Sequence, residues 1–351
     1  MVQTILVTGA NSYIGAWIVK YLVEKGYQVR GTVRSAAREA QVLDGIAQEN
    51  RAQLSFVYVN DIATDSFDEA VQGVDGIIHV ASPFHFKVTD PEKDLLKPAV
   101  QGTLGVLQAA HKYNQANNNP IKRIVITSSF AAVFDPAHGF RPGYSYTEKD
   151  WCPLSYEDGV AAKDNPVTAY RASKVCAERA AWDFLKNENP AFTIATVCAP
   201  IVIGPRVGGF KSLDDLNTSN AAIWTLLSSG KDGVVPETRV PVAIDGRDVA
   251  AAHIAALELL RDRNERYVVS AGTFSQQAVL DIVNESTVIP DSIKSQTPTG
   301  TPGQQVPDHY DIDSSKAQQE LNITYIPLKQ TVEELALQFV DLQKKLAETQ
   351  Q

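Results

Sequence analysis

The hydrophobic positions of this 351-residue chain follow two different rhythms, and the change between them falls near residue 200. Up to that point, short apolar runs rich in β-branched residues alternate with longer amphipathic stretches. This repeated alternation of strand and helix predicts an α/β fold with a doubly wound parallel sheet. We expect its strands at Thr4–Thr8, Gln28–Val33, Leu54–Val59, Gly76–Val80, Arg123–Thr127 and Thr193–Cys198.

The amphipathic stretches between these strands predict the helices. One ends at Lys25, just before a glycine, and a second long run covers Pro91–Tyr113. A third, rich in alanine and charge, covers Thr168–Asn187, and Ser66–Glu69 has the form of a capping box that opens another short helix. The stretch Phe134–Val167 is rich in Pro, Gly, Tyr and Asp and lacks periodicity, which indicates a long surface excursion beside the site.

Beyond the sixth strand the alternation ends, because the prolines of Ala199–Pro205 stop the sheet and turn the chain away. We therefore expect residues 1–200 to form the large sheet domain, including the helix at 168–187. Residues 201–351 are expected to form mainly a smaller lobe over the cleft, with some segments returning to the first domain. In this half we expect helices at Leu213–Ser229, Gln276–Asn284 and Leu328–Glu348, a strand at Tyr267–Ser270 and a loop at Gly300–Gln305.

Composition restricts the classes of function. An apolar content of 44% with 21% charged residues is ordinary for a soluble globular protein. The formal net charge of −9 argues against a nucleic-acid or basic membrane-binding surface, and no apolar run reaches spanning length. The strand-like start leaves no room for a signal peptide, so we expect a cytoplasmic protein. Three scattered cysteines and histidines without a His-x-x-x-His pair predict neither a disulfide framework nor a metal site.

The first strand runs into a glycine-containing turn, Gly9-Ala10-Asn11-Ser12-Tyr13-Ile14-Gly15, that opens a helix. In the Rossmann arrangement such a turn brings the backbone and the helix N-terminus to a dinucleotide pyrophosphate. Ser12 stands where the middle glycine is usual, and a serine is small enough to keep the close approach. We expect Gly9, Ser12, Tyr13, Ile14 and Gly15 to contact the cofactor, with a plain strand-to-helix turn as the alternative.

The end of the second strand favours one dinucleotide. No acid occurs between Gln28 and Arg38, whereas selection of NAD requires an acid that accepts from the ribose 2′-hydroxyl. Arg34 and Arg38 instead suit a 2′-phosphate, so we expect NADP as the cofactor; two solvated arginines are the alternative. At the next strand end, Asp61 is expected to accept from the adenine amino group and Ile62 to cover the adenine ring.

Tyr170 and Lys174 form a candidate acid–base pair, because residues i and i+4 lie on one face of a helix. A neighbouring cation stabilises a phenolate and brings the phenol toward proton transfer at neutral pH. The alternative is a core tyrosine beside a solvated lysine. The fifth strand ends in Thr127-Ser128-Ser129, and adjacent strand residues face opposite sides, so only one serine can face the cofactor and donate to a carbonyl.

Three further segments complete an ordered set of motifs: His79-Val80-Ala81-Ser82-Pro83, Pro200…Gly204-Pro205 and Ile244-Asp245-Gly246-Arg247-Asp248. The set resembles the extended short-chain dehydrogenases/reductases. Within them it is similar to the dihydroflavonol-reductase-like branch, and to its yeast and fungal NADPH-dependent aldehyde, methylglyoxal and carbonyl reductases. The resemblance covers essentially the whole chain.

The resemblance implies a role for each candidate residue. Tyr170 would donate the proton in carbonyl reduction, Lys174 would lower the pKa of Tyr170 and bind the nicotinamide ribose, and Ser129 would polarise the carbonyl. The cofactor contacts would extend to Ala81, Ser82 and Pro200, and the substrate pocket would be lined by Phe84, Phe134, Val167, Val202 and Trp224.

These roles imply hydride transfer from NADPH to the carbonyl of an aldehyde or ketone. The pocket is expected to be apolar and without a charged clamp, which favours methylglyoxal-like dicarbonyls, branched aldehydes and aryl or alkyl ketones as substrates. A nucleotide-sugar epimerase or dehydratase of the same fold is one alternative, although it is expected to carry an acid at the second strand end. A non-catalytic NADP-sensing regulator is another, although it has no need of the Ser, Tyr and Lys set. Monomer and homodimer both stay open.

Overall fold

The computed structural model describes residues 3–82, 88–259 and 262–349. Its centre is a seven-stranded sheet in the order β10-β7-β5-β4-β1-β2-β3, and every neighbouring pair runs parallel. The α/β doubly wound fold is thereby confirmed, and six predicted strands agree to within two residues. The seven strands are β1 (Thr4–Thr8), β2 (Gln28–Val33), β3 (Leu54–Tyr58), β4 (Gly76–His79), β5 (Arg123–Ser129), β7 (Thr193–Ala199) and β10 (Glu265–Val268).

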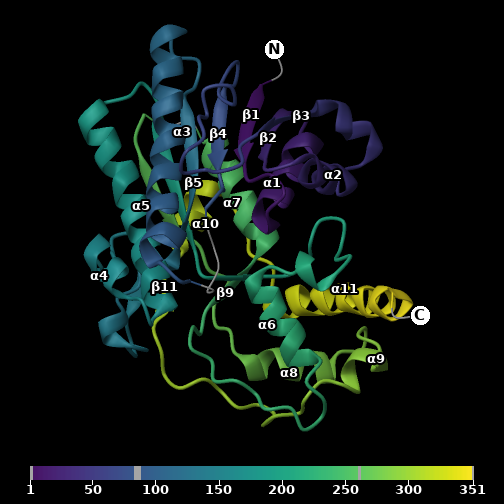
Figure 1. Cartoon of the computed structure of the whole chain (residues 1–351). Coiled ribbons are helices and arrows are strands. Elements are labelled where there is room, and N and C mark those ends of the chain that lie inside the picture. Colours follow the sequence, from purple (N-terminus) through teal and green to yellow (C-terminus); the bar gives the residue numbers. More distant parts are fainter. Residues whose placement is uncertain (1–2, 83–87, 260–261, 350–351) are drawn as a thin grey trace.

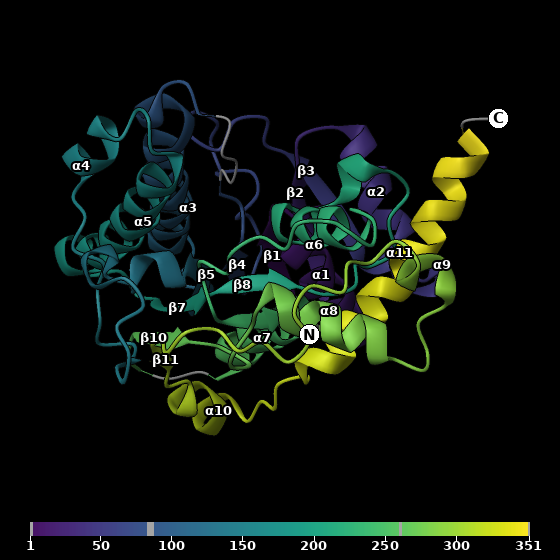
Figure 2. The same ribbon diagram turned by 90° about the horizontal axis from the view of Figure 1, so that it is seen from below.

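Helices cover both faces of this sheet (Figures 1 and 2). Helices α1 (Tyr13–Glu24) and α7 (Gly246–Glu258) pack together on one face, and α3 (Lys97–Ala116) and α5 (Pro166–Glu188) pack together on the other. Each pair buries its apolar side against the strands, which gives two separate cores above and below the sheet. The chain therefore holds β1, β4 and β5 rigidly from both sides, and the carboxyl ends of these strands meet at one edge.

Two helix predictions were wrong in part. Residues 66–73 form turns rather than a helix, because the Ser66 hydroxyl accepts the Asp68 N–H at 3.0 Å and closes a local turn. The predicted helix at 213–229 is divided into a 3₁₀ turn, Leu213–Asp215, and α6 (Thr218–Leu227), since the backbone of Asn217 is extended. Helix α7 was not predicted at all.

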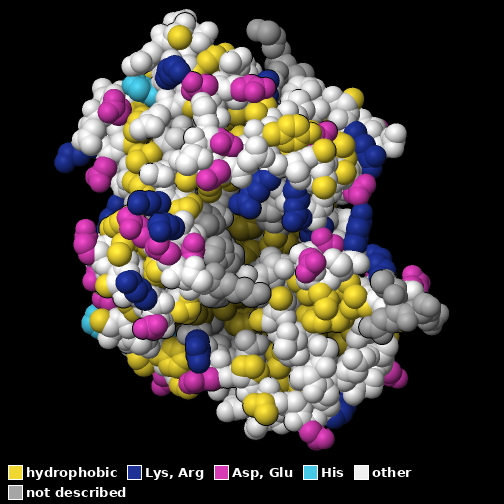
Figure 3. All heavy atoms as spheres, viewed as in Figure 1, with side chains coloured by type: hydrophobic (Ala, Val, Ile, Leu, Met, Phe, Trp, Pro, Cys, Tyr) yellow, Lys and Arg dark blue, Asp and Glu magenta, His cyan; other side chains and the backbone are white. Residues whose placement is uncertain are grey.

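The second lobe lies below the sheet domain (Figure 1), and Figure 3 shows a hollow between the two parts with apolar side chains inside it. Its helices surround a third apolar core. The predicted helices at 276–284 and 328–348 are confirmed to within one residue, and the predicted strand at 267–270 is β10, which returns to the edge of the main sheet. The lobe contains α6, α8 (Gln276–Glu285), α9 (Asp291–Lys294), α11 (Leu328–Thr349) and the strand pair β8 (Ile201–Ile203) and β9 (Ala243–Asp245).

Smaller elements complete the fold. Helix α2 follows β2, and α10 packs beside α7. The two-residue strand β6 lies in the excursion before α5 and pairs with β11, which comes from a much later part of the chain. Among the described helices, none is both long enough and apolar enough to cross a bilayer. The bounds of these elements are α2 (Ala36–Asp44), α4 (Tyr156–Ala161), α10 (Ser315–Leu321), β6 (Ser145–Tyr146) and β11 (Asp311–Ile312).

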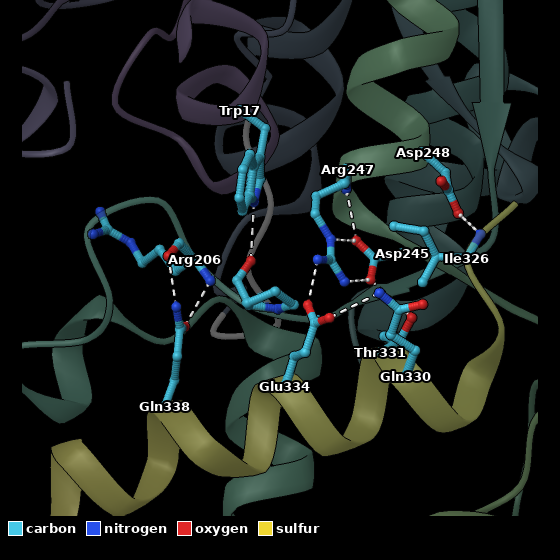
Figure 4. A network of polar contacts seen from close by, with 12 residues as sticks. Trp17, Arg206, Asp245, Arg247, Asp248, Ile326, Gln330, Thr331, Glu334 and Gln338 are labelled. Atoms are coloured by element: carbon cyan, nitrogen blue, oxygen red, sulfur yellow. Dashed lines mark hydrogen bonds and ion pairs between the residues drawn. The ribbon is translucent and has the colours of Figure 1, made fainter. Parts of the chain in front are cut away.

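Helix α11 is fastened to the start of α7 by a polar network (Figure 4). Asp245 caps α7 by accepting the Arg247 N–H at 2.8 Å, and its carboxylate also binds the Arg247 guanidinium. From α11, the Thr331 hydroxyl donates to Asp245 at 2.8 Å and Glu334 binds Arg247. Asp245 is 1% exposed, so these contacts satisfy a carboxylate that would otherwise be costly to bury.

A second set of contacts joins α11 to the loop that follows β8. The side chain of Gln338 accepts from the Arg206 N–H at 2.8 Å and donates to the Arg206 carbonyl at 2.9 Å. The neighbouring Pro205 carbonyl accepts from Trp17 of α1 at 2.9 Å. The loop after β8 is thus held between the first helix of the sheet domain and the helix α11 of the lobe (Figure 4).

Candidate active site

The turn between β1 and α1 is shaped by its two glycines. Gly9 has φ +65°, and a Cβ there would lie 3.1 Å from the Ala81 Cα; a Cβ on Gly15 would lie 2.3 Å from the Gly9 carbonyl oxygen. Ser12 caps α1, since its hydroxyl accepts the Gly15 N–H at 3.1 Å. The substitution of a serine for the usual middle glycine therefore gives the helix an N-cap while it keeps the turn tight.

The next two residues of this turn face the protein. The Tyr13 hydroxyl lies 2.7 Å from where a Cβ on Gly246 would stand, so this ring packs against the start of α7. Ile14 packs on the apolar core between the sheet and α1. The side chains of Tyr13 and Ile14 thus hold the backbone of the predicted cofactor turn against α7 and the apolar core.

The ends of β1 and β4 are tied together by Thr8. Its hydroxyl accepts from the backbone N–H groups of Val80 and Ala81 at 3.0 and 3.1 Å. This contact places Ala81 directly against Gly9 and brings Ser82 to the same edge of the sheet. Ser82 in turn accepts from the Lys174 ammonium at 2.7 Å, so the predicted cofactor residues of β4 meet those of α5.

Arg34 and Arg38 both lie exposed where β2 passes into α2. Arg38 donates to the Gln41 side-chain oxygen at 3.1 Å, and Gln41 donates to Asp215 of the second lobe at 2.9 Å. Asp61 accepts from the Ala63 N–H at 2.8 Å after the end of β3.

Ile62 and Pro200 lie at two other strand ends of the same edge. Ile62 packs against Gly102 of α3, so its side chain belongs partly to the core under that helix. Pro200 follows β7 and is half-buried.

Tyr170, Lys174 and Ser129 come together at the carboxyl edge of the sheet. Helix α5 starts with Pro166 after Asn165, whose side chain accepts the Thr168 N–H at 3.0 Å, so Tyr170 stands in its second turn. The Tyr170 hydroxyl donates to Ser129 at 3.4 Å. The Lys174 ammonium lies 5.7 Å from the centre of the Tyr170 ring.

Burial shifts the pKa values of both members of this pair. It raises the pKa of the Tyr170 phenol to about 12, with the hydrogen bond to Ser129 acting in the opposite direction. It lowers the pKa of the Lys174 ammonium to about 8, since that side chain is 8% exposed. Burial is the largest influence on the pKa of Tyr170 in this structure, and the Lys174 ammonium donates to Ser82.

The two serines at the end of β5 contact different points of α5. Ser129 faces Tyr170, whereas Ser128 is buried and donates to Glu178 of α5 at 2.6 Å. Glu178 also accepts from Arg266 of β10 at 2.8 Å. We call Ser128, Glu178 and Arg266 the anchor. It was not predicted from the sequence, although Glu178 lies four residues after Lys174, which itself lies four residues after Tyr170.

A pocket of about 510 Å³ opens beside Tyr170 and Ser129. Its walls are largely apolar and come from the end of β5, the start of α5, the residues after β7, α6 and the loops around 239 and 310. Ser129, Tyr170, Pro200, Phe134 and Val167 line this pocket, and so do two cations that were not predicted, Arg171 and Arg239.

Two predicted pocket residues lie elsewhere. Val202 points away from the pocket, because its strand neighbours Ile201 and Ile203 line it and Val202 packs on the core over α1 and α7. Trp224 packs edge-on against Phe339 of α11, with ring centres 5.1 Å apart, on the side of α6 that faces the lobe core. Phe84 lies outside the described residues.

Comparison with known proteins agrees with this arrangement. The sequence matches the NAD dependent epimerase/dehydratase family over residues 5–270, which is most of the chain. The chain belongs to this family. It is the extended short-chain dehydrogenase/reductase family that the motifs resemble, and the expected family is thereby confirmed.

Fungal reductases are among the most similar relatives. The chain is 36% identical to the putative NADPH-dependent methylglyoxal reductase GRP2 of Candida albicans, over 96% of this chain and 98% of that protein. It is 35% identical to the ketoreductase azaE of Aspergillus niger, over 95% and 96%. The crystal structure of yeast methylglyoxal/isovaleraldehyde reductase Gre2 complexed with NADPH superposes with a TM-score of 0.87 at 33% identity, covering 98% of this chain and 100% of that one.

Proposed function

We propose that this chain is an NADPH-dependent carbonyl reductase that converts aldehydes and ketones to alcohols, with Tyr170 as the proton donor. The observation that carries the proposal is the hydrogen bond of Tyr170 to Ser129 at the wall of a largely apolar pocket, with Lys174 buried behind the tyrosine. The relatives named above are reductases, and two of their names or titles include NADPH. This supports an oxidoreductase that uses NADP.

The residues at the sheet edge suit a dinucleotide. The turn at Gly9 and Gly15 has no room for a Cβ, and α1 begins directly after it, as an approach to pyrophosphate requires. Arg34 and Arg38 are exposed beside the turn, where they would hold a 2′-phosphate, and Lys174 would bind the nicotinamide ribose. NADPH, when bound, supplies the hydride that reaches the carbonyl carbon.

The protein's own groups handle the carbonyl oxygen. Tyr170 and Ser129 both line the pocket, so a carbonyl placed between their hydroxyls accepts two hydrogen bonds as negative charge develops. With a pKa near 12 the phenol is protonated at neutral pH, and it can give its proton once the carbonyl oxygen gains the negative charge of an alkoxide. The carbon gains the hydride and the oxygen gains the Tyr170 proton, which balances the reduction to an alcohol.

The largely apolar walls favour substrates with an apolar body. Methylglyoxal-like dicarbonyls, branched aldehydes and aryl or alkyl ketones are the classes we propose. The first experiment is NADPH oxidation, followed at the nicotinamide absorbance, with a panel of these compounds and with NADH as the control. Turnover that prefers NADPH supports the proposal. NADPH binding without reduction of any panel member would favour a non-catalytic NADP-sensing role over the reductase function.

The two arginines test the cofactor assignment. Replacing Arg34 and Arg38 by alanine is expected to raise the KM for NADPH by about 10-fold or more, because each charge-assisted contact contributes about 1.5–3 kcal/mol. The KM for NADH should change little, since NADH has no 2′-phosphate. Equal losses with both cofactors would show that the arginines act on something other than the phosphate.

A further inference from the structure

The substrate pocket holds two cations and no described acid. Of the described side chains that line it, Arg171 and Arg239 are the charged ones, and none is Asp or Glu. These two charged side chains in the pocket wall were not predicted from the sequence. Arg239 is exposed at the wall, whereas Arg171 is half-buried and directly follows Tyr170 on α5.

Among the described residues, no carboxylate pairs with the half-buried Arg171. Its guanidinium lies 4.8 Å from the centre of the Phe134 ring. Burial lowers the pKa of Arg171, and the nearby Cys152 and Tyr310 act in the opposite direction. An arginine stays charged in a protein, so this cation carries a desolvation cost that the aromatic face offsets only in part.

Two other arginines of this region, Arg179 and Arg266, have the hydrogen-bond acceptors that Arg171 does not have among the described residues. Arg179, eight residues further along α5, is also half-buried and lies near the ring of Trp151, but it donates to the carbonyls of Cys152 and Leu154 at 2.8 and 3.2 Å. Arg266 is buried and forms an ion pair with Glu178. Arg171 differs from both because its aromatic contact is at the wall of a pocket that a ligand can enter.

We propose that Arg171 binds a carboxylate of the substrate, so that the preferred substrates are oxo acids with an apolar body. This inference rests on the proposed reductase function and names the substrate class of the same pocket. The reacting carbonyl would lie at Tyr170 and Ser129, and the carboxylate would lie to one side, against Arg171. Because adjacent residues on a helix point about 100° apart, the two groups bind at separate places in one pocket.

A carboxylate fits this wall better than a phosphate. A guanidinium presents two parallel N–H groups that match the two oxygens of a carboxylate, and such pairs are stronger than neutral hydrogen bonds. A phosphate carries more charge, and the second cation of this pocket, Arg239, is exposed to solvent, where its attraction is screened. The separation of carboxylate from carbonyl also matters, since an anion directly at Tyr170 would oppose the charge that develops on the carbonyl oxygen.

The test compares two ketones of equal size and equal intrinsic reactivity. In 4-oxo-4-phenylbutanoate the carboxylate is insulated from the ketone by two methylenes, and 4-oxo-4-phenylbutanamide is its neutral counterpart. For the unmodified protein, kcat/KM with NADPH is expected to be at least tenfold higher for the acid. A ratio of one or below overturns the proposal, and members with one or three methylenes locate the best spacing.

Variants assign the preference to its residue. Arg171→Met is expected to reduce the acid-to-amide ratio to near one, and Arg171→Lys to retain a part of it. Arg179→Met is the matched control, because it removes a half-buried arginine of the same helix outside the pocket and should keep the ratio even if stability falls. An Arg171→Met protein that keeps the full ratio would exclude this arginine as the carboxylate site.

A binding measurement separates this proposal from the reductase proposal. Calorimetry with 4-phenylbutanoate and 4-phenylbutanamide, which cannot be reduced, needs no turnover. Tighter binding of the acid by tenfold or more, lost in Arg171→Met, supports the carboxylate site even if no ketone is reduced. Equal binding of acid and amide by a protein that does reduce neutral ketones overturns the carboxylate site and leaves the reductase function intact.

Discussion

The two sides of the junction between β5 and α5 use the same residue types for different purposes. On one side, Ser129 meets Tyr170 at a pocket. On the other, Ser128 donates to Glu178 under the sheet. The serines are adjacent on one strand, and the tyrosine and glutamate lie eight residues apart on one helix. Both partners lie on α5 about two helical turns apart, so Tyr170 meets Ser129 at the pocket and Glu178 meets Ser128 in the interior.

The buried contact at Ser128 and the pocket contact at Ser129 also differ in how the charged groups beside them are paired. Burial by itself would raise the pKa of Glu178, but Arg266, Ser128 and Thr196 hold that pKa below its usual value. Arg266 further donates to the carbonyls of Ala132 and Glu148, so the anchor has both signs of charge and many hydrogen bonds. In the site, Lys174 is buried with a serine as its partner. We infer that the anchor is built for stability, and that the site retains charge for a ligand.

The largest expected effect comes from removing the proton donor. Tyr170→Phe should lower kcat/KM for carbonyl reduction by about 10²–10⁴-fold, the usual contribution of a positioned acid. The unfolding midpoint should change little, because the ring and its packing stay. Steady-state kinetics beside a thermal melt and an NADPH titration would check this. A variant that keeps more than a tenth of the rate would remove Tyr170 from the proposed mechanism.

Breaking the anchor should act on stability instead. Glu178→Gln leaves Arg266 as a buried cation without its counter-charge, so we expect a loss of about 3–5 kcal/mol in the free energy of unfolding, measured by urea titration. Glu334→Gln is the control, since that carboxylate lies in a partly exposed pair with Arg247 and should cost about 1 kcal/mol or less. Similar losses in the two variants would argue against the anchor.

Replacing each serine by alanine tests the difference between the pocket contact and the buried contact directly. Ser129→Ala should lower kcat by about 10²-fold, as loss of one donor to a developing oxyanion does, with a small effect on stability. Ser128→Ala should cost about 1–3 kcal/mol of stability, because Glu178 loses a buried donor. The test measures kcat and the unfolding midpoint for both variants. If Ser128→Ala has the lower kcat at a temperature where both variants are folded, the roles assigned to the two serines are wrong.

The smallest effect concerns pH. The pKa of Lys174 is lowered to about 8, so its charge is lost as the pH rises through that value, whereas Tyr170, near 12, stays protonated. If the reaction needs this ammonium, kcat/KM should fall about fivefold between pH 8 and pH 9. Lys174→Arg keeps the charge and should move the fall to higher pH. A profile that is flat to pH 10 would show that the charge is not required.

Local patterns were sufficient to predict the sheet domain. The strands β1 to β5, strand β7 and helix α5 follow the simple alternation of strand and helix, and the i, i+4 spacing of Tyr170 and Lys174 depends only on helix geometry. The helix α7 was missed, although its alanine-rich sequence follows a capping aspartate, Asp245. The division of residues 213–229 was missed because a local turn at Asp215 competes with helix formation.

The pocket wall could not be predicted in the same way. It is assembled from α5, α6 and loops that are distant in sequence, so the side chains that line it depend on how these elements pack. Val202 was assigned to the wrong face of a three-residue strand, and Trp224 to the wrong side of α6. Arg171 was passed over because an arginine beside Tyr170 on a helix is expected at a solvated surface.

The network in Figure 4 has a consequence for how the chain is made. Glu334 follows Arg247 by 87 residues, and Gln338 follows Arg206 by 132. During translation the strands of the main sheet therefore leave the ribosome well before α11. The loop after β8 cannot form its hydrogen bonds to Gln338 until α11 has been synthesised. The lobe, whose apolar core includes residues of α11, should be among the last regions to become protease-resistant on a nascent chain.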